Sequence, residues 1–164
     1  MLFQKNKKNI PRGVLIAPAD GQVIPLSKVP DEVFAQGILG KGGAIEPRGE
    51  EICSPADATV VNIAETRHAY SLLTEDGLEL LVHVGIDTVT LKGEGFECAV
   101  KEGDRVRAGD PLVRIDRTRL ESAGCPLTTP VVISNPELLD HLELCSGIAE
   151  GGRTPMLTYR RKTN

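Results

Sequence analysis

The sequence is poor in aromatic residues, and this limits what its core can be made of. Among its 164 residues there are no tryptophans, three phenylalanines and two tyrosines, although the hydrophobic fraction is an ordinary 40%. The core must therefore consist mainly of valine, leucine, isoleucine and alanine. Seventeen glycines and eleven prolines interrupt the chain often, which favours short strands joined by many turns.

Several classes of protein are disfavoured by what is missing. A net charge of -4 argues against a general nucleic-acid-binding protein, which would carry a basic face. The four cysteines form no C-x-x-C pair, so they indicate neither a zinc knuckle nor a redox motif. No apolar run approaches the roughly 20 residues that span a bilayer, and no signal peptide follows the N-terminal lysines. We therefore expect a cytoplasmic protein that is peripheral to a membrane at most.

The length fits one domain preceded by a short tail. Residues 1–13, MLFQKNKKNIPRG, are expected to be flexible, and residues 14–164 to form the domain. The segments APADGQVIPL (17–26) and SPADATVVNI (54–63) share Pro, Ala, Asp and Val at the same offsets. Each predicts a turn followed by a strand, and the glycine turns in 100–116 add a related pattern. The sequence thus predicts an all-β domain, an antiparallel sandwich or barrel-like fold with one or more short helices.

Three segments are candidates for helical structure. In SNPELLDHLELC, residues 134–145, capping residues and a proline precede leucines at helical spacing, so we expect a helix with His141 on its exposed face. Residues 29–38 are expected to hold one helical turn that begins at Asp31. Residues 116–124 are expected to hold another.

A histidine in the middle of an apolar strand is the feature that most needs a function. In LLVHVGIDTV, residues 80–89, alternation separates an apolar core face from a mixed outer face. The core face carries Leu78, Leu80, Val82 and Val84, and the outer face carries Glu79, Leu81, His83 and Gly85. An unpaired buried imidazole would cost about 1 to 3 kcal/mol, and alternation places His83 outside the core.

The turn TEDG, residues 74–77, folds the preceding segment back onto this strand. If all four residues form the loop, His68 lies opposite His83. If only the last two form it, His68 is the diagonal neighbour, about 7 to 8 Å away. A three-residue loop would put the two histidines on opposite faces and exclude their pairing. By the same alternation Thr66 shares the face of His68, so its hydroxyl can approach that imidazole.

Two neighbouring histidines are compatible with several functions. One is phosphoryl transfer through a phosphohistidine, because an imidazole with a pKa of about 6.5 is a competent nucleophile at neutral pH. A zinc-dependent hydrolase would need a third protein ligand and a base, but the chain has neither H-x-H nor H-E-x-x-H. A lipoyl- or biotinyl-type carrier would need a lysine in an MKM or DKA setting, which is missing. Incidental surface histidines are the simplest alternative.

Five segments are more specific than these patterns: VPDEVFAQGILGKGGAI, ETRHAYS, VHVGIDTVTLKGEGF, EGDRVRAGD and TPVVISN. With these segments in this order, the chain from about Ile16 to Thr158 resembles the enzyme IIA component of the glucose family of the bacterial phosphoenolpyruvate-dependent sugar phosphotransferase system. The resemblance implies a mostly antiparallel β-sandwich. It also implies a phosphotransferase system enzyme with a phosphohistidine intermediate. We expect no cofactor and assign no metal site, although in some bacteria a zinc ion bridges the two histidines of this protein.

The resemblance also implies roles for individual residues. His83 matches the histidine that is phosphorylated on Nε2, His68 the second histidine that steadies the phosphoryl group, and Thr66 the threonine that hydrogen-bonds His68. Asp31 and Asp87 match aspartates that pair with a basic group of the partner. The expected apolar docking rim consists of Val33, Phe34, Leu81, Val84 and Val89.

The partners implied by the resemblance use one surface in turn. The phosphoryl group comes from the histidine-containing phosphocarrier protein and passes to the IIB domain of a IIB/IIC sugar permease, which couples sugar uptake to sugar phosphorylation. In some bacteria the unphosphorylated protein also binds regulatory targets, so a purely regulatory binding protein is a further alternative. The residues do not identify the sugar.

Overall fold

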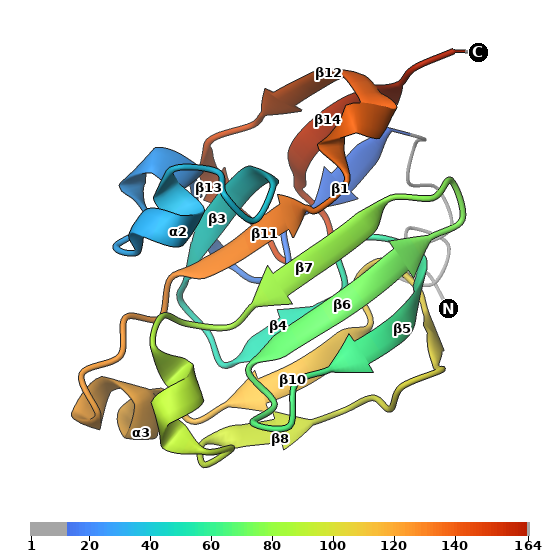
Figure 1. Ribbon diagram of the computed structural model, residues 1–164. Coiled ribbons are helices and arrows are strands. Elements are labelled where there is room, and N and C mark those ends of the chain that lie inside the picture. Colours follow the sequence, from blue (N-terminus) through green and yellow to red (C-terminus); the bar gives the residue numbers. More distant parts are fainter. Residues whose placement is uncertain (1–12, 164) are drawn as a thin grey trace.

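The computed structural model describes residues 13–163, which form mainly short strands (Figure 1). In chain order the strands are β1 (Val14–Ile16), β2 (Gly21–Pro25), β3 (Lys41–Pro47), β4 (Glu51–Cys53), β5 (Ala58–Ile63), β6 (Ala69–Thr74), β7 (Glu79–His83), β8 (Phe96–Cys98), β9 (Arg105–Val106), β10 (Pro111–Ile115), β11 (Thr129–Ile133), β12 (Leu139–Leu144), β13 (Gly147–Ala149) and β14 (Pro155–Arg161). The helical elements are η1 (Leu26–Lys28), α2 (Glu32–Ala35), η2 (Thr88–Leu91), α3 (Arg117–Ser122) and η3 (Pro136–Leu138), where η marks a 3-10 helix. The predicted mostly antiparallel β fold with short helices is confirmed.

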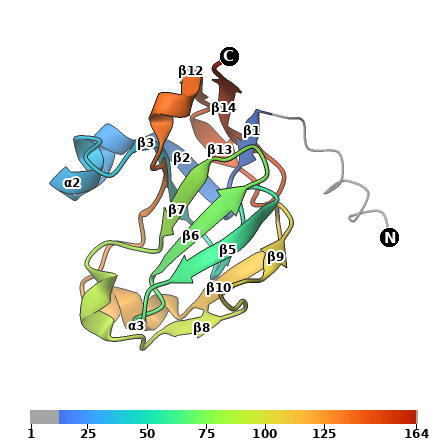
Figure 2. The ribbon, with the colours of Figure 1, turned by 45° about the vertical axis from the view of Figure 1, so that its right-hand side comes forward.

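The described strands form three antiparallel sheets. The largest has eight strands in the order β13-β2-β3-β11-β7-β6-β5-β9, and two three-stranded sheets have the orders β4-β10-β8 and β1-β14-β12. In both ribbon views β8 and β10 lie below β5 and β6, while β12 and β14 lie above β7 (Figures 1 and 2). One buried apolar cluster joins the three sheets and includes Leu15, Leu72, Val82, Leu112 and Leu157.

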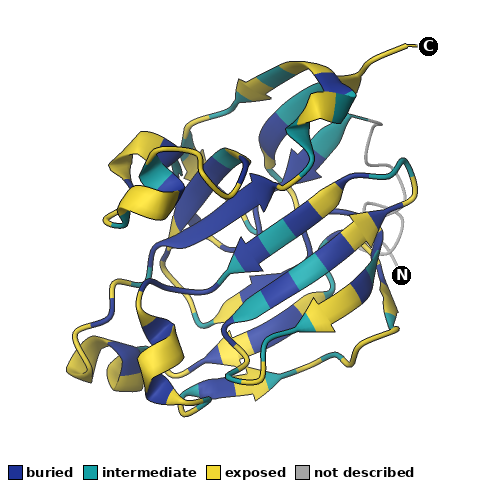
Figure 3. Ribbon diagram, in the orientation of Figure 1, coloured by how far each residue is buried: buried dark blue, intermediate teal, exposed yellow. Residues whose placement is uncertain are grey.

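Burial alternates along β7 in the predicted sense (Figure 3). Leu80 and Val82 are buried in the main core, whereas Leu81 and His83 on the other face are only half-buried. The hydrophobic effect thus fixes which face of β7 turns inward, and that leaves the imidazole at the end of the strand on the outer face.

A smaller apolar cluster covers part of this outer face. It contains Leu26, Val29, Phe34, Ala44, Ile86 and Val132. The short helix α2 brings Phe34 there, because the Asp31 carboxylate caps the helix by accepting hydrogen bonds from the backbone N–H groups of Val33, at 2.9 Å, and Phe34, at 3.4 Å. The predicted helical turn that begins at Asp31 is confirmed. The predicted turn in residues 116–124 is also confirmed, as α3.

The two PAD repeats form equivalent turns. The carboxylate of Asp20 accepts a hydrogen bond from the backbone N–H of Gly151, at 2.7 Å, and that of Asp57 accepts one from Ala108, at 2.9 Å. In each case the turn precedes a strand of the large sheet, β2 or β5. The repeated aspartate therefore ties a strand entrance to a distant glycine-rich loop, which explains why it recurs.

The predicted helix at residues 134–145 is wrong. Only Pro136–Leu138 are helical, and Leu139–Leu144 form β12, paired with β14. A register shift between Leu139 and His141 leaves the two consecutive residues 140 and 141 exposed. This β-bulge gives the leucines a spacing that imitates one face of a helix. His141 is exposed, as expected, but on a strand.

The ends of the chain complete the description. Of the predicted flexible tail, residues 1–12 lie outside the described residues, and the backbone carbonyl of Gly13 accepts a hydrogen bond from the N–H of Tyr159 at 2.8 Å. The helices within residues 13–163 fall short of the length and apolarity that a membrane span requires.

Candidate functional site

His83 is the last residue of β7, and its ring is held by the backbone that follows it. Its Nδ1 lies 2.8 Å from the carbonyl oxygen of Gly85. A carbonyl oxygen only accepts hydrogen bonds, so Nδ1 must carry the hydrogen and Nε2 keeps its lone pair. On the other side the ring of Phe34 lies 4.9 Å from that of His83, centre to centre, with the planes tilted by 59°.

His68 lies beside His83, but the β6–β7 register differs from both registers that predicted this proximity. The β6–β7 pairing puts Leu73 opposite Glu79 and Ala69 opposite His83, so the loop includes Glu75, Asp76 and Gly77 and spans three residues between paired positions 74 and 78. This is the register that was expected to exclude the pairing. The hairpin interpretation was therefore wrong in its register.

The two histidines meet nevertheless, because His68 precedes β6 and does not follow its alternation. Arg67 has a left-handed backbone with φ of 60°, and this turns the chain just before His68. The His68 carbonyl accepts a hydrogen bond from the N–H of Val84 at 2.6 Å. The two imidazole centroids are 4.9 Å apart with their planes at 80°, an edge-to-face arrangement.

Thr66 completes a chain of polar groups behind His83. Its hydroxyl oxygen lies 2.7 Å from Nδ1 of His68. If the hydroxyl donates this bond, the hydrogen of His68 resides on Nε2, where it is available to an anion bound at His83. The structure thus brings together the three residues predicted to be catalytic: His83, His68 and Thr66.

Both imidazoles favour the neutral form. Burial is the main cause that lowers the pKa of His83 below its ordinary 6.5, and the Gly85 hydrogen bond and the carboxylates of Asp31 and Asp87 offset it only in part. Burial, followed by the charge of the neighbouring His83, lowers the pKa of His68. At neutral pH each ring therefore has an unprotonated nitrogen.

A neutral histidine thus lies beside a second one on a mostly antiparallel β fold. The family described as the phosphoenolpyruvate-dependent sugar phosphotransferase system, EIIA 1, matches residues 13–138. The glucose-specific EIIA component of Buchnera aphidicola subsp. Acyrthosiphon pisum is 39% identical over 158 residues, which cover 96% of this chain and 98% of that protein. The chain belongs to this EIIA family.

Further relatives of this EIIA chain agree with the family assignment. The glucose permease IIA from Mycoplasma capricolum has a similar structure, with a TM-score of 0.79 and 33% identity, over 88% of this chain and 94% of that one. The glucose-specific EIIBCA component of Corynebacterium glutamicum is 50% identical over 121 residues, which are 74% of this chain but 18% of that protein. The EIIA chain thus spans less than a fifth of the length of that relative, and it matches the EIIA components over most of theirs.

The predicted docking residues of this EIIA chain differ in how they reach the surface. Val33 is 41% exposed and Val89 is 53% exposed, and Leu81 is half-buried on the outer face. Phe34 is largely buried against the His83 ring, and Val84 is fully buried on the core face, as alternation requires. Val84 therefore has no place on a docking surface.

Two features of the site were missed in the sequence. The carbonyl of Gly85 fixes the His83 tautomer, whereas the sequence placed Gly85 only on the same face as His83. Ile38 and Leu39, just after α2, are 66% and 40% exposed and extend the apolar surface. Their only sequence signal was two large apolar residues in a glycine-rich turn, GILGKGG.

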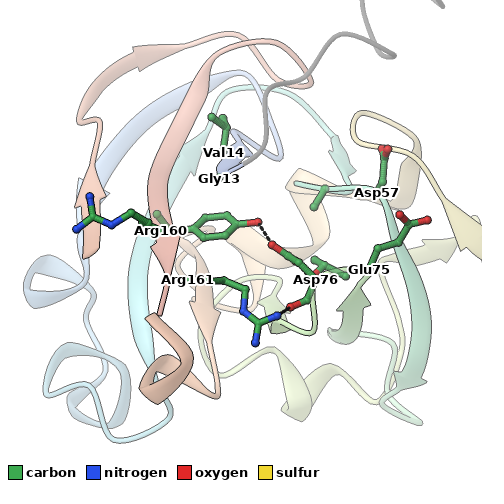
Figure 4. Close-up of a pocket in the computed structure, with 10 residues that line it drawn as sticks. Gly13, Val14, Asp57, Glu75, Asp76, Arg160 and Arg161 are labelled. Carbon is green, nitrogen blue, oxygen red and sulfur yellow. Dashed lines mark hydrogen bonds between the residues drawn. The ribbon is translucent and has the colours of Figure 1, made fainter. Parts of the chain in front are cut away.

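The histidines of this EIIA chain lie outside the cavity drawn in Figure 4. That cavity, of about 680 Å³, is lined by Gly13, Val14, Ala56, Asp57, Thr74, Glu75, Asp76, Tyr159, Arg160 and Arg161. It lies at the turn of the β6–β7 hairpin, whereas His83 ends β7 at the other end. The Tyr159 hydroxyl donates a hydrogen bond to Asp76 across it, at 2.8 Å (Figure 4).

The histidine pair offers few ligands to a metal ion. Within residues 13–163 no group of three or more His, Cys, Asp or Glu side chains is arranged to hold a metal ion. His68 and His83 supply two imidazoles, one fewer than the three protein ligands that a catalytic zinc site uses.

Proposed function

We propose that this EIIA chain accepts a phosphoryl group on Nε2 of His83 from the histidine-containing phosphocarrier protein and passes it to the IIB domain of a sugar permease. The observation that carries the proposal is the hydrogen bond from Nδ1 of His83 to the Gly85 carbonyl, because it leaves the lone pair on Nε2. The lowered pKa of His83 keeps that nitrogen unprotonated at neutral pH.

In the transfer, Nε2 of His83 attacks the phosphorus of the donor phosphohistidine. A new N–P bond forms as the old one breaks, and the electron pair of the old bond returns to the donor imidazole. Positive charge develops on the His83 ring as the bond forms, and the Gly85 carbonyl at Nδ1 stabilises it. His68, oriented by Thr66, donates a hydrogen bond from Nε2 to a phosphoryl oxygen. The second transfer, to IIB, reverses these roles.

The docking surface is proposed to surround His83. The exposed apolar residues Val33, Ile38 and Val89, with Leu81 behind them, supply the area that a partner covers. Asp31 and Asp87 interact electrostatically with His83 and are placed to pair with a basic group of either partner. Donor and acceptor then exclude each other, because both must cover the same imidazole.

The proposal is tested by incubating the purified chain with phosphoenolpyruvate, enzyme I and the phosphocarrier protein. We expect one acid-labile, base-stable phosphoryl group per chain, measured by mass. His83→Gln should abolish it, and His68→Gln should retain acceptance but transfer poorly to IIB. His141→Gln, on exposed β12, is the matched control and should behave as wild type. Labelling that survives His83→Gln would overturn the assignment.

A further inference from the structure

Thr88 is a fully buried polar residue at the start of η2, beneath the loop that follows His83. Its hydroxyl donates a hydrogen bond to the carbonyl oxygen of Val84, with 2.7 Å between the two oxygens. Because a carbonyl only accepts, the direction of this bond is fixed. It closes the segment from Val84 to Thr88 into a compact loop, and Gly85 lies inside that loop.

The methyl group of Thr88 packs directly against Gly85. Gly85 has a left-handed backbone with φ of +76°, and a Cβ atom added there would lie 2.6 Å from Cγ2 of Thr88 and 3.1 Å from the carbonyl oxygen of Pro126. Neither distance is an ordinary side-chain contact. The Gly85 backbone is therefore enclosed between Thr88 on one side and the segment after α3 on the other.

The segment after α3 supports the loop through its backbone. The N–H of Ile86 donates a hydrogen bond to the Pro126 carbonyl at 2.9 Å, and the thiol of Cys125 approaches the Asp87 carbonyl at 3.8 Å. These contacts hold the residues that follow Gly85. The start of the loop, at Val84, is held by the hydroxyl group of Thr88.

We propose that Thr88 is a positioning residue for phosphoryl transfer: it holds the Gly85 carbonyl at Nδ1 of His83 and thereby keeps the hydrogen off Nε2. Its hydroxyl fixes the start of the loop at Val84 and thereby the orientation of the Gly85 peptide that follows, while its methyl group fills the space beside Gly85. An imidazole released from the Gly85 carbonyl is free to carry its hydrogen on Nε2, where the nitrogen has no lone pair for attack. The catalytic part rests on the proposed function, whereas the tautomer is a property of the chain alone.

The test uses the full chain labelled with 15N-histidine and two readouts. The chemical shifts of the two ring nitrogens report the tautomer of His83 directly, without any partner. Thr88→Val keeps the shape of the side chain and removes the hydroxyl. We expect it to raise the population of the Nε2–H form of His83 and to slow phosphorylation by the phosphocarrier about tenfold or more, at unchanged KM for that carrier.

Three further variants complete the test. Thr90→Val is the matched control, since Thr90 lies in the same η2 turn and donates from an exposed hydroxyl to the Asp87 carbonyl, at 2.8 Å. It should leave the His83 tautomer and the rate unchanged. Thr88→Ser retains the hydroxyl and should keep the Nδ1–H form. If Thr88→Val fails to fold, Thr88→Ala removes both groups without a branched side chain and takes its place.

The outcomes separate the two proposals. A His83 tautomer and a rate that are unchanged in Thr88→Val overturn the role of Thr88, as does a tautomer lost equally in Thr88→Ser. If wild-type chain is never phosphorylated, the proposed function fails, and the nitrogen shifts still decide whether Thr88 fixes the tautomer.

Discussion

Replacing Gly85 by alanine tests how tightly the loop after His83 is packed. Gly85 has a φ of +76°, in the left-handed region, where an alanine costs roughly 1 to 2 kcal/mol relative to glycine. Its added methyl group would also meet Thr88 Cγ2 at 2.6 Å and the Pro126 carbonyl at 3.1 Å. Such overpacking of a buried site typically costs a further 1 to 3 kcal/mol, roughly. We therefore expect Gly85→Ala to lower the free energy of unfolding by about 2 to 5 kcal/mol.

The chain contains a control with the same backbone conformation. Gly124 also has a φ of +76°, but a Cβ atom there would have no neighbour within 4 Å. Gly124→Ala should therefore show the backbone cost alone, about 1 to 2 kcal/mol. The difference between the two variants isolates the contact with Thr88 and Pro126.

Equilibrium urea unfolding, followed by circular dichroism, measures both variants under the same conditions. Equal losses for Gly85→Ala and Gly124→Ala would refute the tight packing of Gly85. Gly85→Ala should in addition slow phosphorylation of His83, because the shifted carbonyl no longer holds Nδ1, whereas Gly124→Ala should leave the rate unchanged. A Gly85→Ala variant that is phosphorylated at the wild-type rate would show that the packing around Gly85 does not control the reactivity of His83.

Three other results are expected. Burial lowers the pKa of His83 and of His68 below 6.5, so the rate of phosphorylation should stay constant down to about pH 6.5 and fall at lower pH. The free energy of unfolding should also decrease below that pH, because the unfolded chain then binds more protons than the folded chain. An NMR titration midpoint above 6.5 for either ring would contradict this. Arg67→Gly should raise the free energy of unfolding by roughly 1 kcal/mol in urea, by relieving the left-handed strain at φ of 60°, and no gain would argue against that strain. Val89→Lys, at a 53% exposed site, removes an apolar contact and adds a charge that repels the basic group of the partner, so it should raise the KM for the phosphocarrier about tenfold with unchanged urea stability. An unchanged KM would move the docking surface elsewhere.

The inner and outer faces of β7 were predictable from the sequence because a buried strand obeys a strict period of two. Leu80 and Val82 are buried and His83 is on the outer face, as the alternation indicated. The capped turn at Asp31 was predictable for a similar reason, since an aspartate before a short apolar segment supplies a local hydrogen bond acceptor. Both patterns depend only on residues that are close together in the sequence.

The register of the β6–β7 hairpin could not be predicted, because TEDG is compatible with loops of two, three or four residues. The three-residue loop is stabilised by the Thr74 hydroxyl, which accepts a hydrogen bond from the N–H of Leu78 at 2.9 Å, and by Gly77 in a left-handed conformation. The pairing of His68 with His83 arises from the turn at Arg67, and nothing in the alternation of β6 indicates that turn. The prediction that the two histidines are neighbours is right, but the hairpin register from which it was derived is wrong.

The β12 strand shows a second limit. Its leucines have helical spacing because a bulge adds a residue, and the strand forms because it pairs with β14. That partner is a separate segment, Pro155–Arg161, so a tertiary pairing overrides the local preference. Asn135, expected among the capping residues, instead accepts a hydrogen bond from the N–H of Glu79 at 2.9 Å and donates one to the Gly77 carbonyl.

The two histidines of the proposed site belong to different kinds of structure: His83 to the pleat of a sheet and His68 to the turn at residues 64–68. An insertion or deletion in that turn would move His68 and leave every strand pair of the large sheet in register. The spacing of the imidazoles is thus adjustable independently of the core. In the proposed function, the contact of His68 with the phosphoryl group could therefore change through residues of this turn alone, while His83 stays fixed in the sheet.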